Sequence, residues 1–404
     1  MTCRSCGAAL THPVVDLGAA PPSNAYRSAA QLGLPERWYP LRVLACTECW
    51  LVQTAYSPSE ELFDPEYAYF SAVSPSWLSH CERYVEQVVA RLGLDRTSHV
   101  VEVAANDGYL LQYLVARGIP CLGIEPTAST AAAARVRGVP ILQAFFGESL
   151  ATGLAAEGRR ADLLIANNVL AHVPDLHDFV RGCARLLHHQ GVATFEFHHL
   201  LRLVREAQID TIYHEHYSYL SLTVVQRIFE ANGLVVFDVE QLPTHGGSLR
   251  VYAQRADAAL RPVEDSVLRV AEEERAAGVM TASLYAGVQE ATDRLKHAFL
   301  RFLLDARAAG RTVAGYGTAA KASTLINYAG VRPDLLPFVA DRSRAKQGLF
   351  LPGSRIPVVE EQHVRNARPD DLIVFPWNLR DELTRQLDYV TEWGGRLVFP
   401  PDFT

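Results

Sequence analysis

"HVVEVAANDGYLLQYLVARGIPCLGIEP" occupies residues 99–126 and decides the fold. Its apolar run at 100–103 predicts a buried parallel strand, because strands of such sheets are covered on both faces. A tight turn around Gly108, a helical stretch and a second apolar run at 121–124 follow. The order strand–helix–strand is typical of a doubly wound α/β sheet.

The same alternation continues toward the C-terminus. Further strands are predicted in "ADLLIANN" (161–168), "GVATFEF" (191–197), "GLVVFDVEQLP" (233–243) and "SLRVYAQR" (248–255). After a long helical stretch over about 260–308, "RTVAGYG" (311–317) begins another series of strands and helices. We therefore expect an α/β protein with a small N-terminal module over 1–75, a Rossmann-like unit over 76–255 and a second Rossmann-like unit over 256–404.

Composition and charge exclude several classes of protein. The chain has 404 residues, 49% of them hydrophobic, and a net charge of −7 without a long basic run. Nucleic acid and anionic membranes are therefore not expected as partners. The sequence has no apolar stretch of about 18 residues and no signal-peptide pattern at its start, so we expect a cytoplasmic protein with reduced cysteines.

Four of the seven cysteines form two Cys-x-x-Cys pairs, Cys3/Cys6 and Cys46/Cys49, separated by an irregular segment. Each pair offers two thiolates from one turn, and four soft ligands suit tetrahedral zinc. An all-cysteine set leaves no open coordination position, so it predicts a structural Zn²⁺. The alternatives are unrelated reduced pairs or a redox Cys-x-x-Cys. The CxxxCxxC pattern of radical iron–sulfur enzymes is absent from the sequence.

The turn after the first strand of the α/β unit is a candidate ligand site. Gly108 brings backbone amides close to a ligand, and Glu125 ends the next strand, where an acid can bind a ribose diol. The spacing suits an adenosyl group, and the absence of GxGxxG argues against NAD. The alternative is a plain strand–turn–helix with a surface glutamate.

Two later segments concentrate titratable side chains. "ANNVLAHVPD" (166–175) places Asn168 and His172 in a strand-end loop, where open α/β sheets bind ligands. "TIYHEHYSYLS" (211–221) carries Tyr213, Glu215 and His216, and in an extended chain Tyr213 and Glu215 would face away from His216. The spacing differs from the HExxH metal helix. A capped helix start and a polar loop, respectively, remain as alternatives.

"VAGYGTAAKAST" (313–324) opens the last unit with a strand, a Gly-x-Gly turn and a helix that carries Lys321. Helix N-terminal amides with one ammonium group can hold an anion. The full P-loop pattern is absent from the sequence, so triphosphate hydrolysis is not expected. A second plain strand–turn–helix is the alternative.

In this order, the cysteine pairs, "EVAANDG", "GIEP", "YxEH", "HGG" and "GYGTAAKAS" resemble the S-adenosylmethionine-dependent sugar C-methyltransferases. The resemblance spans essentially the whole chain. It implies methylation at C-3 of a TDP-linked 4-keto-deoxy sugar in natural-product deoxysugar biosynthesis, with S-adenosylmethionine as cofactor and structural Zn²⁺. We expect a monomer.

The resemblance also implies roles for individual residues. For catalysis they are His216 as general base, with Tyr213, Glu215 and His172. For the cofactor they are Glu102, Ala104, Asn106, Asp107, Gly108, Glu125 and Asn168. For the nucleotide sugar they are Tyr67, Tyr69, His245, Gly246, Gly315, Tyr316, Gly317 and Lys321. For the metal they are Cys3, Cys6, Cys46 and Cys49.

Two positions depart from the family pattern. Ala104 replaces a glycine of the cofactor turn, which adds a methyl group and loses easy access to positive φ. His198 replaces a frequent proline and puts the identity of the substrate in question. These departures leave open a C-methyltransferase of a non-sugar ketone or aromatic compound, or a binding module without activity. A zinc-dependent nucleic-acid binder conflicts with the acidic charge.

Overall fold

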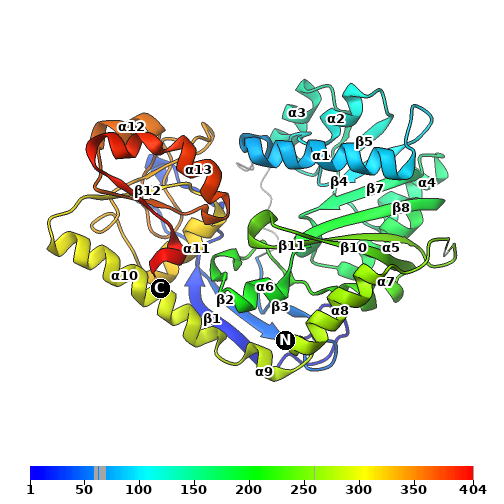
Figure 1. Cartoon of the computed structure of the whole chain (residues 1–404), viewed down its shortest axis with the longest axis horizontal. Helices are drawn as coiled ribbons and strands as arrows, with labels where there is room; N and C mark the ends of the chain where they lie inside the picture. Colours follow the sequence, from blue (N-terminus) through cyan, green and yellow to red (C-terminus); the bar gives the residue numbers. More distant parts are fainter. Residues whose placement is uncertain (59–61, 63–69, 259, 404) are drawn as a thin grey trace.

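A computed structural model describes residues 1–58, 62, 70–258 and 260–403. Three β-sheets organise these residues (Figure 1). A seven-stranded sheet with its helices lies on the right of the view, a five-stranded sheet on the left, and a four-stranded N-terminal sheet below and between them. No helix in the described ranges is long and apolar enough to cross a membrane. Tyr67 and Tyr69 lie outside the described residues.

The seven-stranded sheet confirms the predicted doubly wound fold. Its order is β10-β11-β8-β7-β4-β5-β6, and β11 is antiparallel to both of its neighbours. The inner strand β4 is buried at all four positions, as its apolar run predicts. Its strands are β4 (Val100–Val103), β5 (Cys121–Ile124), β6 (Ile141–Leu142), β7 (Ala161–Asn167), β8 (Leu187–His198), β10 (Leu234–Leu242) and β11 (Ser248–Arg255).

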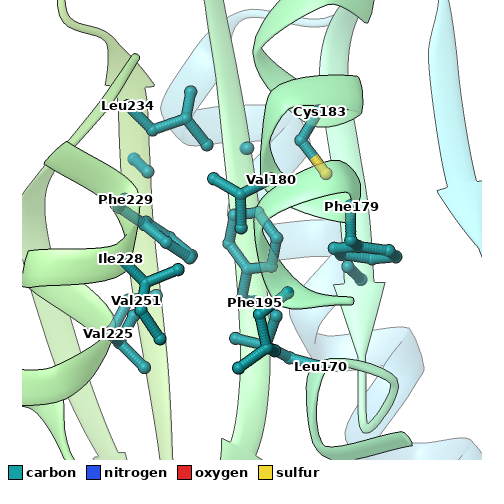
Figure 2. Close-up of a cluster of buried hydrophobic side chains, with 14 of the residues drawn as sticks. Leu170, Phe179, Val180, Cys183, Phe195, Val225, Ile228, Phe229, Leu234 and Val251 are labelled. Atoms are coloured by element: carbon teal, nitrogen blue, oxygen red, sulfur yellow. The ribbon is translucent and has the colours of Figure 1, made fainter. Parts of the chain in front are cut away.

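Seven helices lie in the same part of the chain. They are α1 (Pro75–Leu92), α2 (Leu111–Ala116), α3 (Ala128–Val136), α4 (Glu148–Ala156), α5 (Leu176–Leu186), α6 (Leu200–Arg205) and α7 (Leu222–Glu230). Helix α1 begins because Ser74 caps Trp77 N and proline occupies the first turn, and it ends at the left-handed Gly93. Apolar side chains of α5 and α7 pack on the sheet, where the rings of Phe195 and Phe229 lie 4.7 Å apart (Figure 2).

The N-terminal sheet corrects one expectation, since the segment between the cysteine pairs is not irregular. Strands β1 (His12–Ala20) and β2 (Tyr39–Ala45) pair antiparallel, and β3 (Val52–Thr54) continues the sheet. Register shifts around Pro13 and between Asp16 and Ala19 interrupt the strand alternation, which hides it in the sequence. The fourth strand, β9 (Ser218–Tyr219), comes from the histidine-rich segment far along the chain.

The C-terminal sheet is the second predicted α/β unit, parallel throughout, in the order β14-β13-β12-β15-β16. Its strands are β12 (Val313–Tyr316), β13 (Val339–Ala340), β14 (Val358–Val359), β15 (Asp371–Val374) and β16 (Arg396–Val398), and its helices are α11 (Ala320–Ala329), α12 (Glu361–Ala367) and α13 (Arg380–Gln386). The helical stretch before it is three helices, α8 (Asp265–Ala277), α9 (Ala282–Tyr285) and α10 (Val288–Ala308). Gly278 and Gly287, both with positive φ, separate them.

Candidate active site

One cavity of about 790 Å³ joins the three sheets. Its wall includes Asn24 from the N-terminal unit, Asn168 and His216 from the central unit, and Tyr316 and Lys321 from the C-terminal unit. It lies at the carboxyl ends of parallel strands, where open α/β sheets bind ligands. Its volume falls within the range of about 300–1,000 Å³ for small-molecule sites.

The turn after β4 forms one end of the cavity. Ala104 and Asn106 line it with left-handed backbones, φ 58° and 46°. Glu125 also lines it, and its Oε2 accepts the Asn106 amide at 2.9 Å. Gly108 (φ 77°) serves packing, because a Cβ there would lie 2.9 Å from Val139 Cγ2. The turn therefore presents backbone groups and one acid, as an adenosyl site requires.

Glu102 lies behind this turn, fully buried in β4. Burial raises its carboxyl pKa well above the usual value. Asn168 directly follows β7 and has φ 53°, and its Nδ2 lies 3.3 Å from His245 Nε2. His245 has φ 55°, so two left-handed, non-glycine residues meet at the cavity wall.

Residues 211–219, which we call the catalytic segment because the predicted catalytic residues Tyr213, Glu215 and His216 lie in it, fold into a turn and not into an extended chain. The His216 amide donates to Tyr213 O at 3.0 Å, and the Tyr213 hydroxyl lies 2.7 Å from His216 Nε2. Tyr213 and His216 therefore meet, whereas the alternation of an extended chain would separate them. The strand β9 begins only at residue 218, after this turn.

The protonation of His216 follows from its partners. Its Nδ1 lies 2.7 Å from the Thr211 carbonyl, which can only accept, so Nδ1 carries the hydrogen. Nε2 therefore holds the lone pair. Burial, together with His172, whose ring centroid is 4.7 Å away, keeps the His216 pKa well below its ordinary value. Burial also lowers the pKa of His172 to about 4. The two rings are neutral near pH 7.

The two other polar members of the segment differ in position. Glu215 lines the cavity, and its Oε1 accepts the Asn24 amide at 2.7 Å. His214, which the sequence pattern does not place, packs against Tyr39 and contacts its carbonyl at 3.3 Å. His214 is not part of the cavity wall that the described residues form.

Lys321 lies at the start of α11, in the part of the cavity wall that the C-terminal unit forms. Its ammonium is 3.6 Å from Asp210 Oδ2 and 4.8 Å from the centre of the Trp377 ring. Trp377 Nε1 donates to the same carboxylate oxygen at 2.6 Å. Asp210 comes from the central unit and Trp377 from the C-terminal unit. The group therefore joins the two units beside the catalytic segment.

The glycines expected near the substrate are packing positions. A Cβ on Gly315 would lie 2.8 Å from Val339 Cγ2, and one on Gly246 would lie 2.5 Å from Trp377 Cη2. A Cβ on Gly317 would lie 2.4 Å from the Pro376 ring. Each allows two elements to approach closely, and among the three only Gly317 lines the cavity.

Several lining residues were not predicted. Trp77 and His80 on α1, and Asp341 and Lys346 after β13, all face the cavity. His198, which the sequence analysis singled out as a departure from the family pattern, also lines the cavity at the end of β8. Lys346 lies 3.9 Å from Asp341 Oδ2, which also accepts the Thr318 amide. Asp341 could have been predicted from the sequence, because it directly follows the second strand of a Rossmann-like unit. The α1 residues carry no such signal.

His198 has a fixed tautomer. The Gln208 amide nitrogen donates to Glu206 Oε2 at 2.7 Å and to the Gly246 carbonyl at 2.8 Å. Its amide oxygen must therefore accept from His198 Nε2, 2.5 Å away, which leaves Nδ1 with the lone pair. Burial lowers the His198 pKa to about 3, so the ring is neutral.

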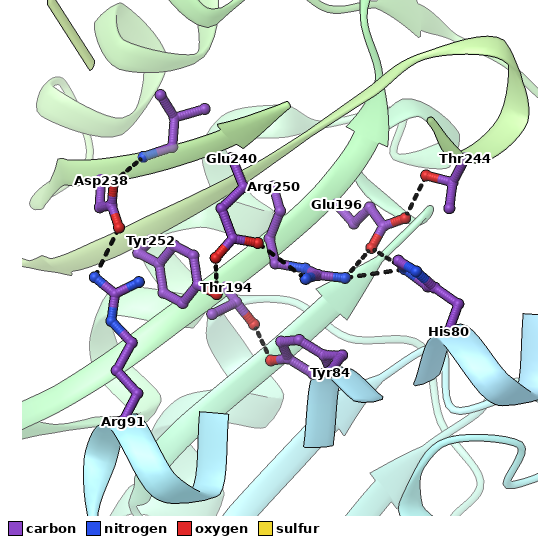
Figure 3. A network of polar contacts seen from close by, with 11 residues as sticks. His80, Tyr84, Arg91, Thr194, Glu196, Asp238, Glu240, Thr244, Arg250 and Tyr252 are labelled. Carbon is purple, nitrogen blue, oxygen red and sulfur yellow. Dashed lines mark hydrogen bonds and ion pairs between the residues drawn. The ribbon is translucent and has the colours of Figure 1, made fainter. Parts of the chain in front are cut away.

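A charged network supports this part of the wall (Figure 3). Glu196 accepts from Arg250 at 2.6 Å, from His80 at 3.0 Å and from the Thr244 hydroxyl at 2.9 Å. Arg250 also donates to Glu240 at 3.1 Å. Burial raises the pKa of Glu196, but His80 and Arg250 outweigh it and lower the pKa to about 2. The network joins α1, β8, β10 and β11 to the turn that carries His245.

The four predicted metal ligands meet in space. Their sulfur atoms lie within 4.8 Å of one another, with 3.5 Å between Cys3 and Cys49 and between Cys6 and Cys46. Tetrahedral zinc with bonds of about 2.3 Å requires sulfur separations of about 3.8 Å. Gln53 Nε2 donates to Cys3 Sγ at 3.1 Å, as expected beside a metal-bound thiolate. The set fits a closed tetrathiolate zinc site.

Three family models match successive parts of the chain. They are "Putative zinc binding domain" over 3–63, "Methyltransferase domain" over 77–239 and "C-methyltransferase C-terminal domain" over 243–401. The chain is 32% identical over 398 residues to C-methyltransferase NovU of Streptomyces niveus, covering 98% of this chain and 94% of that protein.

Solved structures give weaker matches. Magnesium protoporphyrin IX methyltransferase from Synechocystis PCC 6803 with bound SAH is 16% identical, covering 44% of this chain and 83% of its own, with a TM-score of 0.36. The PH0226 protein from Pyrococcus horikoshii OT3 is 13% identical, covering 50% and 100%, with a TM-score of 0.38. Likeness at this level adds nothing to the fold described above.

Proposed function

This chain belongs to the S-adenosylmethionine-dependent C-methyltransferases that combine a zinc-binding domain, a methyltransferase domain and a C-methyltransferase C-terminal domain, and we propose that it methylates C-3 of a TDP-linked 4-keto-deoxy sugar. The observation that carries the proposal is His216. It is a neutral imidazole with its lone pair on Nε2, in a cavity shared by the cofactor turn and the C-terminal unit.

The chemistry begins with a proton transfer. Carbon becomes nucleophilic only as an enolate, so the proton next to the ketone must leave. His216 Nε2 takes this proton, the C–H electron pair forms a carbon–carbon double bond, and the carbonyl π pair moves to oxygen. The Tyr213 hydroxyl, 2.7 Å from Nε2, turns to that oxygen and donates a hydrogen bond to it.

When bound, S-adenosylmethionine would supply an electrophilic methyl group, which the enolate carbon would take as the carbon–sulfur bond breaks. The cavity of about 790 Å³ holds both substrates in contact, which contributes several kcal/mol to the barrier reduction. Ala104, Asn106, Glu125 and Asn168 would hold the cofactor, and the four cysteines would hold a structural Zn²⁺.

The C-terminal unit suits the nucleotide. Two buried ammonium groups, Lys321 and Lys346, lie in the wall beyond β12, where a diphosphate needs positive charge. Tyr316 also lines this wall and donates to Glu361 at 3.1 Å. We propose that the sugar nucleotide binds here, with its ketone toward the catalytic segment.

Replacing His216 tests the proposal. We expect His216→Asn to lower kcat for methyl transfer to a TDP-4-keto sugar by about 10²–10⁴, because a positioned base contributes that much. His214→Asn is the matched control, because His214 lies two residues away and contacts Tyr39. Methyl transfer at the wild-type rate by the His216 variant would remove His216 from the mechanism.

The second candidate substrate is a non-sugar ketone or an aromatic compound. The neutral His198 in the wall favours it, because an uncharged acceptor suits many hydroxyl or amino donors. A thermal shift series with TDP separates the candidates. Stabilisation by TDP supports the sugar nucleotide, and no stabilisation up to millimolar TDP favours the alternative.

A further inference from the structure

Arg4 connects the cysteine cluster to the catalytic segment. It lies inside the first Cys-x-x-Cys turn, between Cys3 and Cys6. Its Nη1 donates to the Tyr217 carbonyl at 3.0 Å and to the Thr54 carbonyl at 2.7 Å. Its guanidinium carbon is 5.3 Å from the centre of the Tyr217 ring. Tyr217 directly follows His216, so a side chain of the metal-binding turn holds the backbone next to the base.

The backbone of Tyr217 is held from two sides. Its carbonyl also accepts the Thr54 amide at 3.1 Å, so two residues of the N-terminal unit bind one oxygen. Its amide donates to the Ala171 carbonyl at 2.8 Å, in the loop that carries His172. Tyr217, one residue from His216, is therefore held between the N-terminal unit and the loop that carries His172.

Gln53 provides a second path between the same two places. Its Nε2 donates to Cys3 Sγ at 3.1 Å, and its Oε1 accepts the Arg4 amide at 3.0 Å. Gln53 also pairs with Ser218 where β3 meets β9. Arg4 and Gln53 therefore each connect Cys3 to the residues that follow His216.

The charges of the cysteine cluster and of Arg4 are also complementary. Four thiolates around Zn²⁺ carry a net charge of about −2, and the Arg4 guanidinium lies in the turn beside them.

We propose that the cysteine cluster is a positioning device for the general base, and that Arg4 transmits metal occupancy to the catalytic segment. This proposal rests on the assignment of His216 as the base. Arg4 is a positioning residue, since it acts through the Tyr217 carbonyl. Its effect is large because a displacement of about 1 Å in a reacting group can cost about 100-fold in rate.

Arg4→Gln in the full-length, zinc-loaded protein tests the link. We expect one zinc per chain, unchanged KM for S-adenosylmethionine, and a kcat lowered by about 10–100-fold. Deuterium uptake from solvent at the acidic carbon of the keto sugar, with S-adenosylhomocysteine bound, should fall by the same factor. Arg4→Lys should recover part of the rate. Arg42→Gln is the control, since Arg42 lies on β2 of the same unit and pairs with the exposed Asp16.

A measurement without turnover separates this proposal from the assignment of the base. Removing zinc from the wild-type protein with a chelator should speed amide hydrogen exchange at 213–219 and leave the strands β4 and β7 protected. Equal exchange at 213–219 with and without zinc overturns the link, and so does an Arg4→Gln protein with wild-type kcat. If the wild type exchanges no substrate deuterium, the base assignment fails, while the amide-exchange result still decides the link.

Discussion

Ala104, in the turn after β4, has a strained backbone. Its φ of 58° is left-handed, a conformation that costs about 1–2 kcal/mol for a residue with a Cβ. We expect Ala104→Gly to raise the free energy of unfolding by about 0.5–1 kcal/mol, after subtracting the greater unfolded-state entropy of glycine. Urea denaturation measures this, with Ala105→Gly as the control, because Ala105 is buried and the change should destabilise. Destabilisation by both variants would contradict the strain.

The low pKa of His216 predicts the pH profile. Because burial and the neighbouring His172 keep this pKa well below 6.5, the base form persists as the pH falls through 6.5. We expect kcat to remain level from pH 8 through 6.5 and to decline only well below it. Steady-state kinetics at saturating substrates check this. A halving of kcat near pH 6.5 would contradict the buried, neutral base.

Lowered pKa values of other buried histidines also determine how stable the folded protein is in acid. The folded protein holds His172, His198 and His245 with pKa values lowered to about 4, 3 and 4, so the unfolded chain binds protons more readily. Their contribution to stability is present above pH 6.5 and is lost as the pH falls toward 4. Folded fraction must therefore be followed at each pH, so that unfolding is not mistaken for titration of the base.

Sequence could identify the titratable residues but not their geometry. The order of motifs placed His216, Tyr213 and Lys321 in one site, and all three line the cavity. The tautomer of His216 depends on the Thr211 carbonyl. That His214 lies outside the cavity wall becomes clear only from its contact with Tyr39. Such contacts come from a turn whose backbone path no local pattern specifies.

At the scale of elements, the network around Glu196 ties helix α1 to strands β8, β10 and β11. Arg250 is almost fully buried, and its removal would leave the Glu196 carboxylate without its charged partner. We expect Arg250→Met to lower the free energy of unfolding by about 3–5 kcal/mol. Arg255→Met is the control on the same strand, since Arg255 pairs with the exposed Asp257 and should cost about 1 kcal/mol or less. Urea denaturation measures both, and equal small losses would contradict the prediction.

Elements with strong periodicity were predictable, and elements completed by distant residues were not. The buried strand β4 and the amphipathic helix α1 follow directly from their apolar spacing. Strand β9 has two residues and exists because β3 pairs with it, so its signal lies in another part of the chain. The bulges of β1 conceal a nine-residue strand in the same way.

At the scale of the whole molecule, the cavity depends on how the C-terminal unit docks on the central one. Trp377 Nε1 donates to Asp210 at 2.6 Å, and Gly246 approaches the Trp377 ring so closely that a Cβ would lie 2.5 Å from it. The turn after β4, which carries Ala104 and Asn106, forms a separate part of the cavity wall. We therefore expect docking to affect the proposed sugar-nucleotide end of the site and to leave the proposed S-adenosylmethionine end intact.

The variant Trp377→Phe tests whether docking affects one end of the site and not the other. It removes the indole donor to Asp210 and keeps an aromatic ring beneath Lys321. A hydrogen bond to a charged group contributes about 1.5–3 kcal/mol, and 1.4 kcal/mol is tenfold in affinity. We expect KM for the sugar nucleotide to rise about tenfold or more, with the Kd for S-adenosylmethionine within twofold of wild type by calorimetry. Trp393→Phe is the control, because its indole donates to Pro369 within the C-terminal unit. An equal loss of affinity for both substrates would mean that Trp377 supports the fold as a whole and not the docking of one unit.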